Sequence, residues 1–261
     1  MTTIVAEPAR DDRAAIDKAF SLLVAFGEDA STGLGVSELA RRTKLSKSTA
    51  FRVLGMLERN AMVERVGTNY RLGARLHDLG RAVYSPGNDR LRDVLLPYLT
   101  ELFEMTRHTV HLAVLHGTDV VYLAKLYGHR TVGAPSRIGG RLPASCTGVG
   151  KVLLAYDADA AAAVLATPLP QLTPRSITDP LSLGQELSNI RRDGVASDNE
   201  ESRLGVHCVA APVLARSGRP IAAMSVSAGA VSDLGALTMP LRRVCASAAH
   251  ALSRSSLGRI A

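Results

Sequence analysis

Residues 37–73 read SELARRTKLSKSTAFRVLGMLERNAMVERVGTNYRLG. The first seven residues, through Thr43, have the spacing of a short amphipathic helix that Ser37 caps, and Lys44 begins a tight turn. Ser46 then stands where the N-cap of a second helix is expected. The stretch therefore predicts two short helices joined by a tight turn.

A hairpin is predicted directly after these two helices. Residues 62–66 and 69–72 alternate between apolar and polar side chains around a Gly-Thr pair. Such alternation around a glycine-containing turn is typical of two antiparallel strands. Two helices followed by a small hairpin indicate a winged helix-turn-helix, a module whose second helix enters the major groove of DNA.

The start of the second helix has the side chains that a DNA-reading helix needs. Ala50, Val53 and Leu54 recur at helical spacing and predict the buried face. Hydroxyls and N-terminal amides bind phosphate, and an arginine such as Arg52 binds a guanine edge. Each side chain could instead be an ordinary solvated one. The candidate DNA-binding residues are Ser37, Arg41, Arg42, Ser46, Lys47, Ser48, Thr49 and Arg52, with Arg65 and Arg71 on the hairpin as backbone contacts.

The net charge of the chain is concentrated in this module. Nine of the 31 basic residues but only two of the 24 acidic ones lie between Arg41 and Arg75, so this segment accounts for the formal charge of +7. A neutral body with one basic module is the pattern expected of a protein that binds a polyanion at one end. A solvated basic face is the alternative interpretation.

The flanking residues predict the domain organisation. A helix is expected over residues 11–26. Apolar residues follow the 4-3-4 spacing of a helix that packs against another helix at Leu72, Leu76, Leu79 and Val83. Pro86 and Gly87 are expected to end that helix. We therefore expect a winged helix-turn-helix over 11–73, a linker helix over 74–87 and an effector-binding and oligomerisation domain over 88–261.

The second domain is expected to be mixed α/β (α+β), with an antiparallel sheet and flanking helices. Its strands are mostly joined by turns, whereas its helices lie between them in sequence. Helices are predicted at 91–103, 147–156, 157–166, 181–192 and 239–254, and strands at 109–115, 120–126, 195–198, 207–214 and 221–227.

Small and polar side chains of this domain predict a pocket for a small polar metabolite. Gly148 opens a predicted helix, where backbone amides and the helix dipole favour an anion such as a carboxylate. Period-two alternation places Cys208 and Ala210 on one face of their strand, and Ser225 and Ser227 on one face of theirs. Asp198 is a nearby acid. A loop position for this acid and a plain buried role for Cys208 are the alternatives.

The composition narrows the class of protein. No apolar run approaches the length of a membrane span, and the first ten residues lack a secretory signal, so we expect a cytoplasmic protein. The cysteines Cys146, Cys208 and Cys245 are odd in number and widely spaced, which argues against a disulfide framework or a structural zinc site. We expect no metal and no cofactor.

Six sequence motifs, taken in chain order, give this chain a resemblance to a known protein family. SELARRTKLSKSTAFRVLGMLE, AMVERVGTNYRLG, ARLHDLG, LPASCTGVGKVLLA, GVASDNEESRLGVHCVAAPV and IAAMSVSAGA closely resemble the IclR-type transcription regulators over nearly the whole chain. The resemblance implies a GAF-like effector domain, a homodimer or dimer of dimers, operator DNA as partner and a small organic-acid or aromatic effector. It implies an effector site at Gly148, Val149, Asp198, Cys208, Ser225 and Ser227. Ser145-Cys146 departs from the pattern, because a histidine often precedes the glycine-rich turn.

Other functions are weighed against a ligand-responsive repressor or activator of a catabolic or metabolic operon. An enzyme using Cys208 or Cys146 as nucleophile needs a base, and His207 lies on the opposite strand face from Cys208. No Ser/His/Asp order, Walker loop or HExxH motif occurs, so we expect no enzyme. Redox sensing through Cys208 is a third hypothesis. Metal binding at His108, His111 and His116 is disfavoured, since alternation places His111 apart from the other two.

Overall fold

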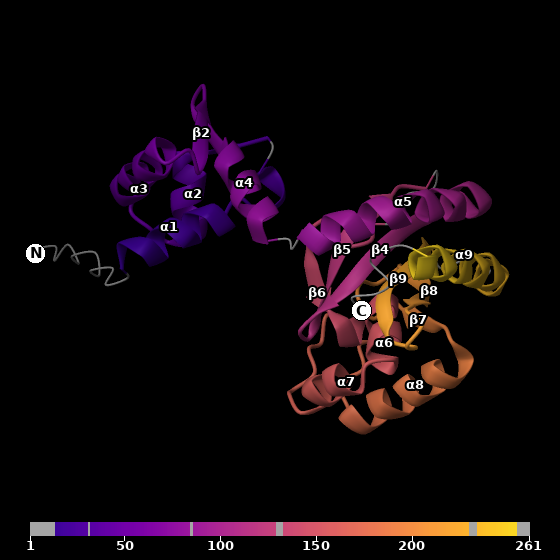
Figure 1. The fold of residues 1–261 in the computed structure, drawn as a ribbon. Helices are drawn as coiled ribbons and strands as arrows, with labels where there is room; N and C mark the ends of the chain where they lie inside the picture. Colours follow the sequence, from indigo (N-terminus) through magenta and orange to yellow (C-terminus); the bar gives the residue numbers. More distant parts are fainter. Residues whose placement is uncertain (1–13, 31, 84–85, 129–132, 230–233, 255–261) are drawn as a thin grey trace, which may run out of the picture. The chain divides into compact units, whose positions relative to one another are not determined.

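A computed structural model describes residues 14–30, 32–83, 86–128, 133–229 and 234–254. The chain divides into two compact units, the first ending at Ser85 and the second beginning at Pro86 (Figure 1). The mixed α/β fold class and the N-terminal helix-turn-helix are confirmed. In the described part of the chain, no helix has the length and apolar character needed to cross a bilayer.

The first unit is a winged helix-turn-helix built on one small core. Its helical elements are α1 (Ala15–Val24), η1 (Gly27–Ala30), α2 (Val36–Thr43), α3 (Lys47–Arg59) and α4 (Ala74–Val83). Strands β1 (Leu34–Gly35), β2 (Val63–Val66) and β3 (Asn69–Leu72) form a sheet in the order β1-β3-β2. The predicted hairpin is confirmed, and so is the tight turn, where Lys44 adopts a left-handed conformation. The core includes Leu22, Phe26, Leu39, Ala50, Val53, Leu54 and Leu57.

One prediction for the first unit, the helix cap at Ser37, is wrong. Helix α2 begins at Val36 with Gly35 at its N-cap, so Ser37 lies in the first turn and caps nothing. The reason is strand β1, which the sequence did not predict: Gly35 pairs with Asn69, and this pairing holds Gly35 extended next to the helix start. Helix α1 begins at Ala15, and residues 11–13 of the predicted first helix lie outside the described residues.

The second unit is a six-stranded antiparallel sheet covered by helices on both faces. The strands are β4 (Thr109–His116), β5 (Asp119–Leu126), β6 (Arg141–Pro143), β7 (Ala196–Asn199), β8 (His207–Leu214) and β9 (Pro220–Ala228), in the order β6-β5-β4-β9-β8-β7. The long helices α5 (Pro86–Thr106) and α9 (Leu234–Arg254) pack side by side and cover one face. The other face packs against α6 (Gly148–Ala155), beyond which lie α7 (Ala158–Leu165) and α8 (Pro180–Asp193), with η2 (Ala144–Cys146) leading into α6 (Figure 1).

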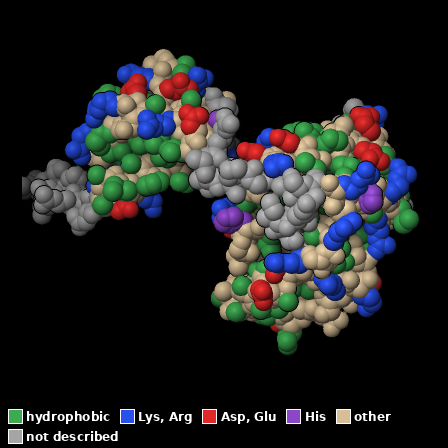
Figure 2. Space-filling view, in the orientation of Figure 1, with side chains coloured by type: hydrophobic (Ala, Val, Ile, Leu, Met, Phe, Trp, Pro, Cys, Tyr) green, Lys and Arg blue, Asp and Glu red, His purple; other side chains and the backbone are tan. Residues whose placement is uncertain are grey.

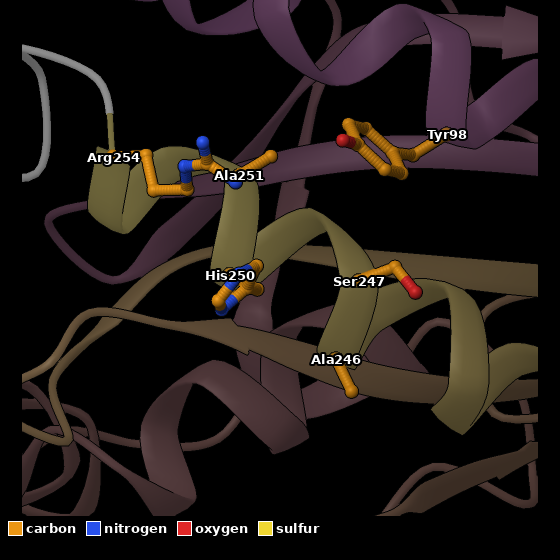
Figure 3. Close-up of a pocket in the computed structure, with 6 residues that line it drawn as sticks. All are labelled: Tyr98, Ala246, Ser247, His250, Ala251 and Arg254. Carbon is orange, nitrogen blue, oxygen red and sulfur yellow. The ribbon is translucent and has the colours of Figure 1, made fainter.

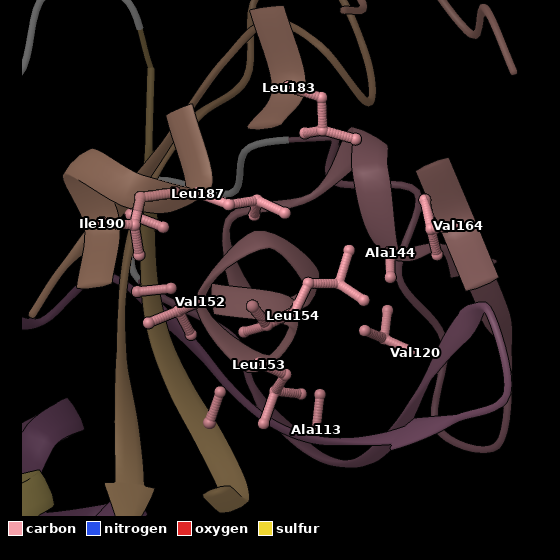
Figure 4. Close-up of a cluster of buried hydrophobic side chains, with 14 of the residues drawn as sticks. Ala113, Val120, Ala144, Val152, Leu153, Leu154, Val164, Leu183, Leu187 and Ile190 are labelled. Atoms are coloured by element: carbon pink, nitrogen blue, oxygen red, sulfur yellow. The ribbon is translucent and has the colours of Figure 1, made fainter. Parts of the chain in front are cut away.

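Helix α6 is the centre of the main core. Val152, Leu153 and Leu154 of α6 are almost fully buried and contact the sheet and the outer helices (Figure 4). Their partners include Ala113 and Val120 of the sheet. Because a core of this kind fixes α6 on both sides, the N-terminus of α6 is held in one position against the sheet.

Two further predictions need correction. Pro86 was expected to end a helix but instead begins α5, which starts five residues before the predicted 91–103 segment. Proline is well suited to the first turn of a helix, because its missing N–H has no partner there. Strand β6 was not predicted, since it has three residues and one of them is Pro143.

Candidate functional site

The start of α3 is fixed by its own hydroxyl side chains. Ser46 is the N-cap, as predicted, and its Oγ accepts a hydrogen bond from the backbone N–H of Thr49 at 3.2 Å. Ser46 Oγ also donates to Thr49 Oγ1 at 2.8 Å and lies 3.1 Å from Ser48 Oγ. The three hydroxyls therefore form one cluster at the tip of the helix, next to its free backbone amides.

The outer face of α3 has a free pair of cations and an exposed aromatic ring. Lys47, Ser48 and Arg52 are exposed, and neither Lys47 nor Arg52 has an ion-pair partner within the described ranges. Phe51 lies among them with 54% of its surface exposed. Phe51 was not among the sequence-predicted site residues, although a large apolar residue on a polar helix face was a visible signal. An aromatic ring on such a helix can contact a thymine methyl group.

The candidate arginines of α2 are held by acids of the first unit. Arg41 donates to both carboxylate oxygens of Glu38, at 2.8 Å from Nε and 2.7 Å from Nη2. Arg42 contacts Glu38, Asp29 and the carbonyl oxygen of Ala25, so it links α2 to the segment before it. Hydrogen bonds from Arg41 and then Arg42 lower the pKa of Glu38 to about 2. Arg42 is thus engaged within the protein, whereas Ser37 is exposed.

The wing arginines differ in their surroundings. Arg71 forms an ion pair with Glu64 across the hairpin, where the two residues are cross-strand neighbours. Arg65 Nε donates to the carbonyl oxygen of Gly67 at 3.2 Å, and its guanidinium lies 5.9 Å from the centre of the Tyr70 ring. Basic side chains are spread over the surface of this unit, as Figure 2 shows.

The six residues implied as an effector site lie around one buried cavity in the second unit. The cavity has a volume of about 20 Å³, which is room for about one water molecule. The sequence analysis missed the other polar lining residues, which come from β4, β5 and three connecting segments. The lining consists of Gly148, Val149, Asp198, Cys208, Ser225 and Ser227 together with His111, Tyr122, Ala134, Pro135, Ser136, Thr147, Ser202 and Val206.

Strand register explains why these residues meet. Cys208 is the cross-strand neighbour of both Asp198 and Ser227. In the next row, Ser225 is paired with His111 on β4. Cross-strand neighbours project to the same face of a sheet, so both rows point toward the N-terminus of α6. The predicted shared face of Cys208 and Ala210 is confirmed, since both approach Gly148.

The N-terminus of α6 closes one side of the cavity. Thr147 is the N-cap, and its Oγ1 accepts a hydrogen bond from the N–H of Gly150 at 3.0 Å. The amides of Gly148 and Val149 lie in the first turn, where backbone N–H groups have no intrahelical partner. A Cβ on Gly148 would stand 3.0 Å from Cys208 Sγ, so glycine lets the helix approach β8 closely. The wall presents amide dipoles directly to the cavity.

Asp198 is a buried acid held by three donated hydrogen bonds. Its Oδ2 accepts from Ser202 Oγ at 2.6 Å, and its Oδ1 accepts from the N–H groups of Glu201 and Ser202 at 2.7 and 3.4 Å. Burial raises the pKa of Asp198, while the bonds from Ser202 and Glu201 and the charge of Lys151 oppose that rise. The donors on its own loop offset part of the cost of burying this acid, and the pKa of Asp198 stays above its ordinary value.

A buried ion pair is connected to Asp198 through Glu201. Lys151 of α6 is fully buried, and its Nζ lies 2.6 Å from Glu201 Oε1 and 3.3 Å from Glu186 Oε1. Burial raises the pKa of Glu201 against the opposing effect of Lys151. Lys151 therefore connects α6 to α8 through Glu186. It also connects α6 to the loop of Asp198, because the N–H of Glu201 donates to Asp198.

His111 forms the opposite wall and lies between two hydroxyls. Its Nε2 is 2.7 Å from Ser136 Oγ, and its Nδ1 is 3.3 Å from Ser225 Oγ. Burial, and secondarily the charge of Lys125, lowers the pKa of His111 to about 3, so the ring is neutral at pH 7. Lys125 Nζ donates to the carbonyl oxygens of Ala134 and Ser136 and so fastens this segment to β5.

The cysteines are poorly suited to reactive roles. Burial raises the pKa of Cys208 to about 12, and burial also raises the pKa of Cys146. A thiol of this kind is rarely ionised, which argues against both the nucleophile and the redox-sensor hypotheses. Within the described ranges, no group of three or more His, Cys, Asp or Glu residues is placed to hold a metal ion.

A larger and more open pocket lies elsewhere, on the surface between α5 and α9. It has a volume of about 660 Å³ and contains none of the predicted site residues. Figure 3 shows its lining, which includes Tyr98 from α5 and His250 and Arg254 from α9. Its openness contrasts with the enclosed cavity beside α6, where the polar groups converge.

Comparison with known proteins identifies both units. A model of the IclR helix-turn-helix domain matches residues 15–67, and a model of the bacterial transcriptional regulator IclR C-terminal domain matches residues 87–254. The chain is similar to the HTH-type transcriptional regulator XynR of Escherichia coli strain K12, with 36% identity over 216 residues, or 81% of this chain and 84% of the relative. It is also similar to KdgR of the same strain, with 35% identity over 222 residues, or 83% and 82%.

Solved structures give the same result. An IclR homolog of Microbacterium hydrocarbonoxydans, crystallised with 4-hydroxybenzoate, matches with a TM-score of 0.74 and 29% identity over 93% of this chain and 100% of the other. The IclR of Thermotoga maritima matches with a TM-score of 0.74 and 30% identity over 93% of this chain and 98% of the other. Relatives named as transcriptional regulators suggest a regulator rather than an enzyme. The chain belongs to the IclR family of DNA-binding bacterial transcription regulators.

Proposed function

We propose that this regulator changes its affinity for operator DNA when a small organic acid or aromatic metabolite binds beside α6, where the cavity of about 20 Å³ must widen to admit it. The proposal rests chiefly on one observation, the convergence of six implied effector residues from α6, β7, β8 and β9 on one buried cavity. Buried polar groups are costly unless they are paired, so a polar cavity inside a core is typical of a binding site.

The chemistry of the cavity supports an acid as ligand. The first-turn amides of Gly148 and Val149 and the hydroxyls of Ser225 and Ser227 are donors that suit a carboxylate. The IclR homolog of Microbacterium hydrocarbonoxydans was crystallised with 4-hydroxybenzoate, which has a carboxylate and an aromatic ring. Asp198 and Cys208 complete the set of residues that we propose to contact the effector.

On the DNA side, the exposed start of α3 is the proposed reader. Arg52, Lys47 and Ser48 are free to reach base edges and phosphates, whereas Ser46 and Thr49 place the helix tip against the backbone. The proposed phosphate contacts are Ser37, Arg41, Arg65 and Arg71, with Arg42 the weakest candidate because three groups of its own unit bind it.

Apolar side chains exposed on the first unit support a homodimer. Ile16, Phe20 and Val24 follow one another at four-residue spacing on α1 and are 65–77% exposed, and Figure 2 shows a hydrophobic band there. On α4, Leu79 is 48% exposed. Because such surface is unfavourable in water, a second copy of the chain is the proposed occupant. Two copies would place two recognition helices on half-sites related by two-fold symmetry, and a dimer of dimers remains compatible with this.

Ligand binding and DNA binding are coupled when the ligand has different affinities for two arrangements of the dimer. A ligand alters DNA binding only if it binds one arrangement of the dimer better than another. Operator spacing is fixed at multiples of a helical turn, about 34 Å, so a change in the spacing of the two recognition helices changes affinity. Either repression or activation of a catabolic or metabolic operon can result from this mechanism.

A thermal-shift experiment tests the cavity. Small carboxylates and aromatic acids, beginning with 4-hydroxybenzoate, are screened against the wild type, Ser225→Ala and Ser188→Ala. A ligand at 100 times its Kd stabilises the protein by about 2.7 kcal/mol. We expect the shift to shrink in Ser225→Ala, which lines the cavity, and to persist in Ser188→Ala, which is exposed on α8. A ligand whose shift is the same in both variants would place the effector elsewhere.

A DNA-binding measurement tests the response. Affinity for the duplex that binds most strongly in a selection from random sequence is measured with and without the ligand found above. The ligand should change the affinity of the wild type and have little effect on Ser225→Ala. An unchanged wild-type affinity at saturating ligand would contradict a regulatory role for the cavity.

The dimer is tested by disrupting the exposed leucine of α4. Leu79→Glu should shift the sedimentation of the protein toward a smaller species, because a charge at a dimer contact must be desolvated. Val66→Glu is the matched control, since Val66 is equally exposed but lies on the wing. Equal sedimentation of both variants and the wild type would remove α4 from the dimer interface.

A further inference from the structure

The effector cavity has an uneven distribution of charge. Among its described lining residues there is no Lys or Arg, and Asp198 is the one acid there. An anion placed in a buried site costs several kcal/mol unless a positive group compensates it. Amide dipoles at a helix N-terminus supply only about half a charge. A carboxylate ligand would therefore enter a site whose described lining has one acid and no basic side chain other than His111.

His111 is the group in this lining that can supply a full positive charge. It is 98% buried, since only 2% of its surface is exposed, and both of its ring nitrogens face hydroxyl groups. A neutral imidazole has one donor and one acceptor nitrogen, whereas an imidazolium has two donors. Ser136 and Ser225 can both become acceptors by rotation of their O–H bonds. Protonation of His111 therefore requires no movement of heavy atoms.

We propose that binding of a carboxylate effector in this cavity is coupled to the uptake of one proton by His111. The proton comes from solvent or buffer and forms an N–H bond on the imidazole, and no other bond changes. This inference rests on the proposed function of the cavity and names both the charge class of the effector and the group that responds to it. Affinity for the carboxylate then increases as pH falls.

The charged and titratable groups around His111 support this assignment. Tyr122 of β5, Asp198 of β7 and Cys208 of β8 line the same cavity. Lys125 of β5 acts on the charge of His111, Arg137 acts on Lys125, and Lys151 of α6 acts on Cys208. Lys125 opposes a charge on His111 in the empty cavity, and its ammonium is occupied by two carbonyl oxygens. A bound carboxylate reverses this balance, because an anion next to an imidazole favours the protonated ring.

Asp198 is the competing acceptor of the proton. Protonation of Asp198 at Oδ2 would leave both backbone N–H bonds to Oδ1 in place but would require the Ser202 hydroxyl to turn from donor to acceptor. The charge of Lys151 favours the ionised acid and opposes this step. The two possibilities predict different behaviour of variants at position 111.

Titration calorimetry measures how many protons the protein takes up when a ligand binds. Formate, acetate, benzoate and 4-hydroxybenzoate, each with its neutral amide as control, are titrated into the full chain at pH 5.5–8.5. Each titration is performed in two buffers with different heats of ionisation. We expect proton uptake that increases toward one proton per carboxylate as pH falls, and a Kd that falls by at most about tenfold per unit of decreasing pH. The amides should bind without proton uptake, and His111→Gln should take up none with any ligand.

The outcomes separate this inference from the proposed function. Carboxylate binding without proton uptake, or undiminished uptake in His111→Gln, overturns the inference and leaves the effector site in place. Absence of binding by every carboxylate at every pH overturns both. If His111→Gln does not fold, ¹⁵N spectra of the histidine rings in the wild type decide: ligand must convert one neutral ring into a doubly protonated one, and unchanged rings contradict the inference.

Discussion

The two candidate sites of this regulator are built in opposite ways. The DNA-reading face uses neighbours in sequence, Lys47, Ser48 and Arg52, on one exposed helix. The effector cavity brings together buried residues as distant as His111 and Ser227. An exposed polar residue costs little wherever it stands, whereas a buried one must be hydrogen-bonded. The first candidate site is therefore marked by its sequence pattern, and the second by buried polar groups that are hydrogen-bonded.

The largest effect is expected from a substitution that destabilises the core of one unit and leaves the core of the other unchanged. Leu54 is fully buried in the first unit, and Leu54→Ala should destabilise that unit by about 2–5 kcal/mol. Because the two units have separate cores, the thermal transition of the second unit should not move. Calorimetric scans of both proteins measure this. A joint shift of all transitions would mean that the units unfold as one.

The next largest effect is expected on the DNA-reading face. Arg52→Ala should cost about 1–3 kcal/mol on the preferred duplex and reduce its advantage over random DNA. Arg65→Ala should weaken binding to both duplexes alike and lower the salt dependence by about one charge. Fluorescence anisotropy at several salt concentrations separates the two. Equal losses on both duplexes for both variants would contradict the distinction between reader and wing.

A pH series measures the free-energy cost of burying His111 as a neutral ring. The pKa of His111 is lowered to about 3, below its unfolded value near 6.5, so between these values the unfolded chain binds a proton that the folded one does not. The free energy of unfolding should therefore decrease as the pH is lowered through this window, by up to about 1.4 kcal/mol per pH unit. Denaturant unfolding of the second unit at pH 4–7 measures the slope. The slope should be smaller in His111→Gln, and equal slopes would contradict burial of a neutral ring.

The smallest expected effect concerns the helix tip. Ser46→Ala removes the acceptor for the N–H of Thr49 and should cost about 1 kcal/mol of stability in the first unit. Ser48→Ala is the matched control, since Ser48 is not the N-cap of α3. Urea titrations of the two variants test the difference. Equal destabilisation would show that the cap geometry contributes nothing particular.

Local pattern explains what the sequence predicted well. The hairpin, the Ser46 cap and the starts of β8 and α6 follow from alternation and capping within a few residues. These signals depend on near neighbours, which the sequence displays directly. The winged module and most strands of the second unit were predictable for that reason.

Long-range pairing explains what was missed. Strand β1 exists because Leu34 meets Tyr70, and this pairing moved the start of α2 away from Ser37. His111 belongs to the cavity because β4 lies beside β9, more than a hundred residues later in the chain. Alternation along β4 assigned a face to His111 but not the neighbours on that face. Such register is a property of the assembled sheet.

One consequence concerns how a family of such regulators can diversify. The close approach of Gly148 to Cys208 leaves little room for change on one side of the cavity, because a Cβ at position 148 would stand only 3.0 Å from Cys208 Sγ. The opposite side is the short segment around Ser136, which hydrogen bonds connect to Lys125 and His111. Mutation of that segment could therefore change the size and shape of the cavity while the proposed anchor for an acid group at the start of α6 is kept.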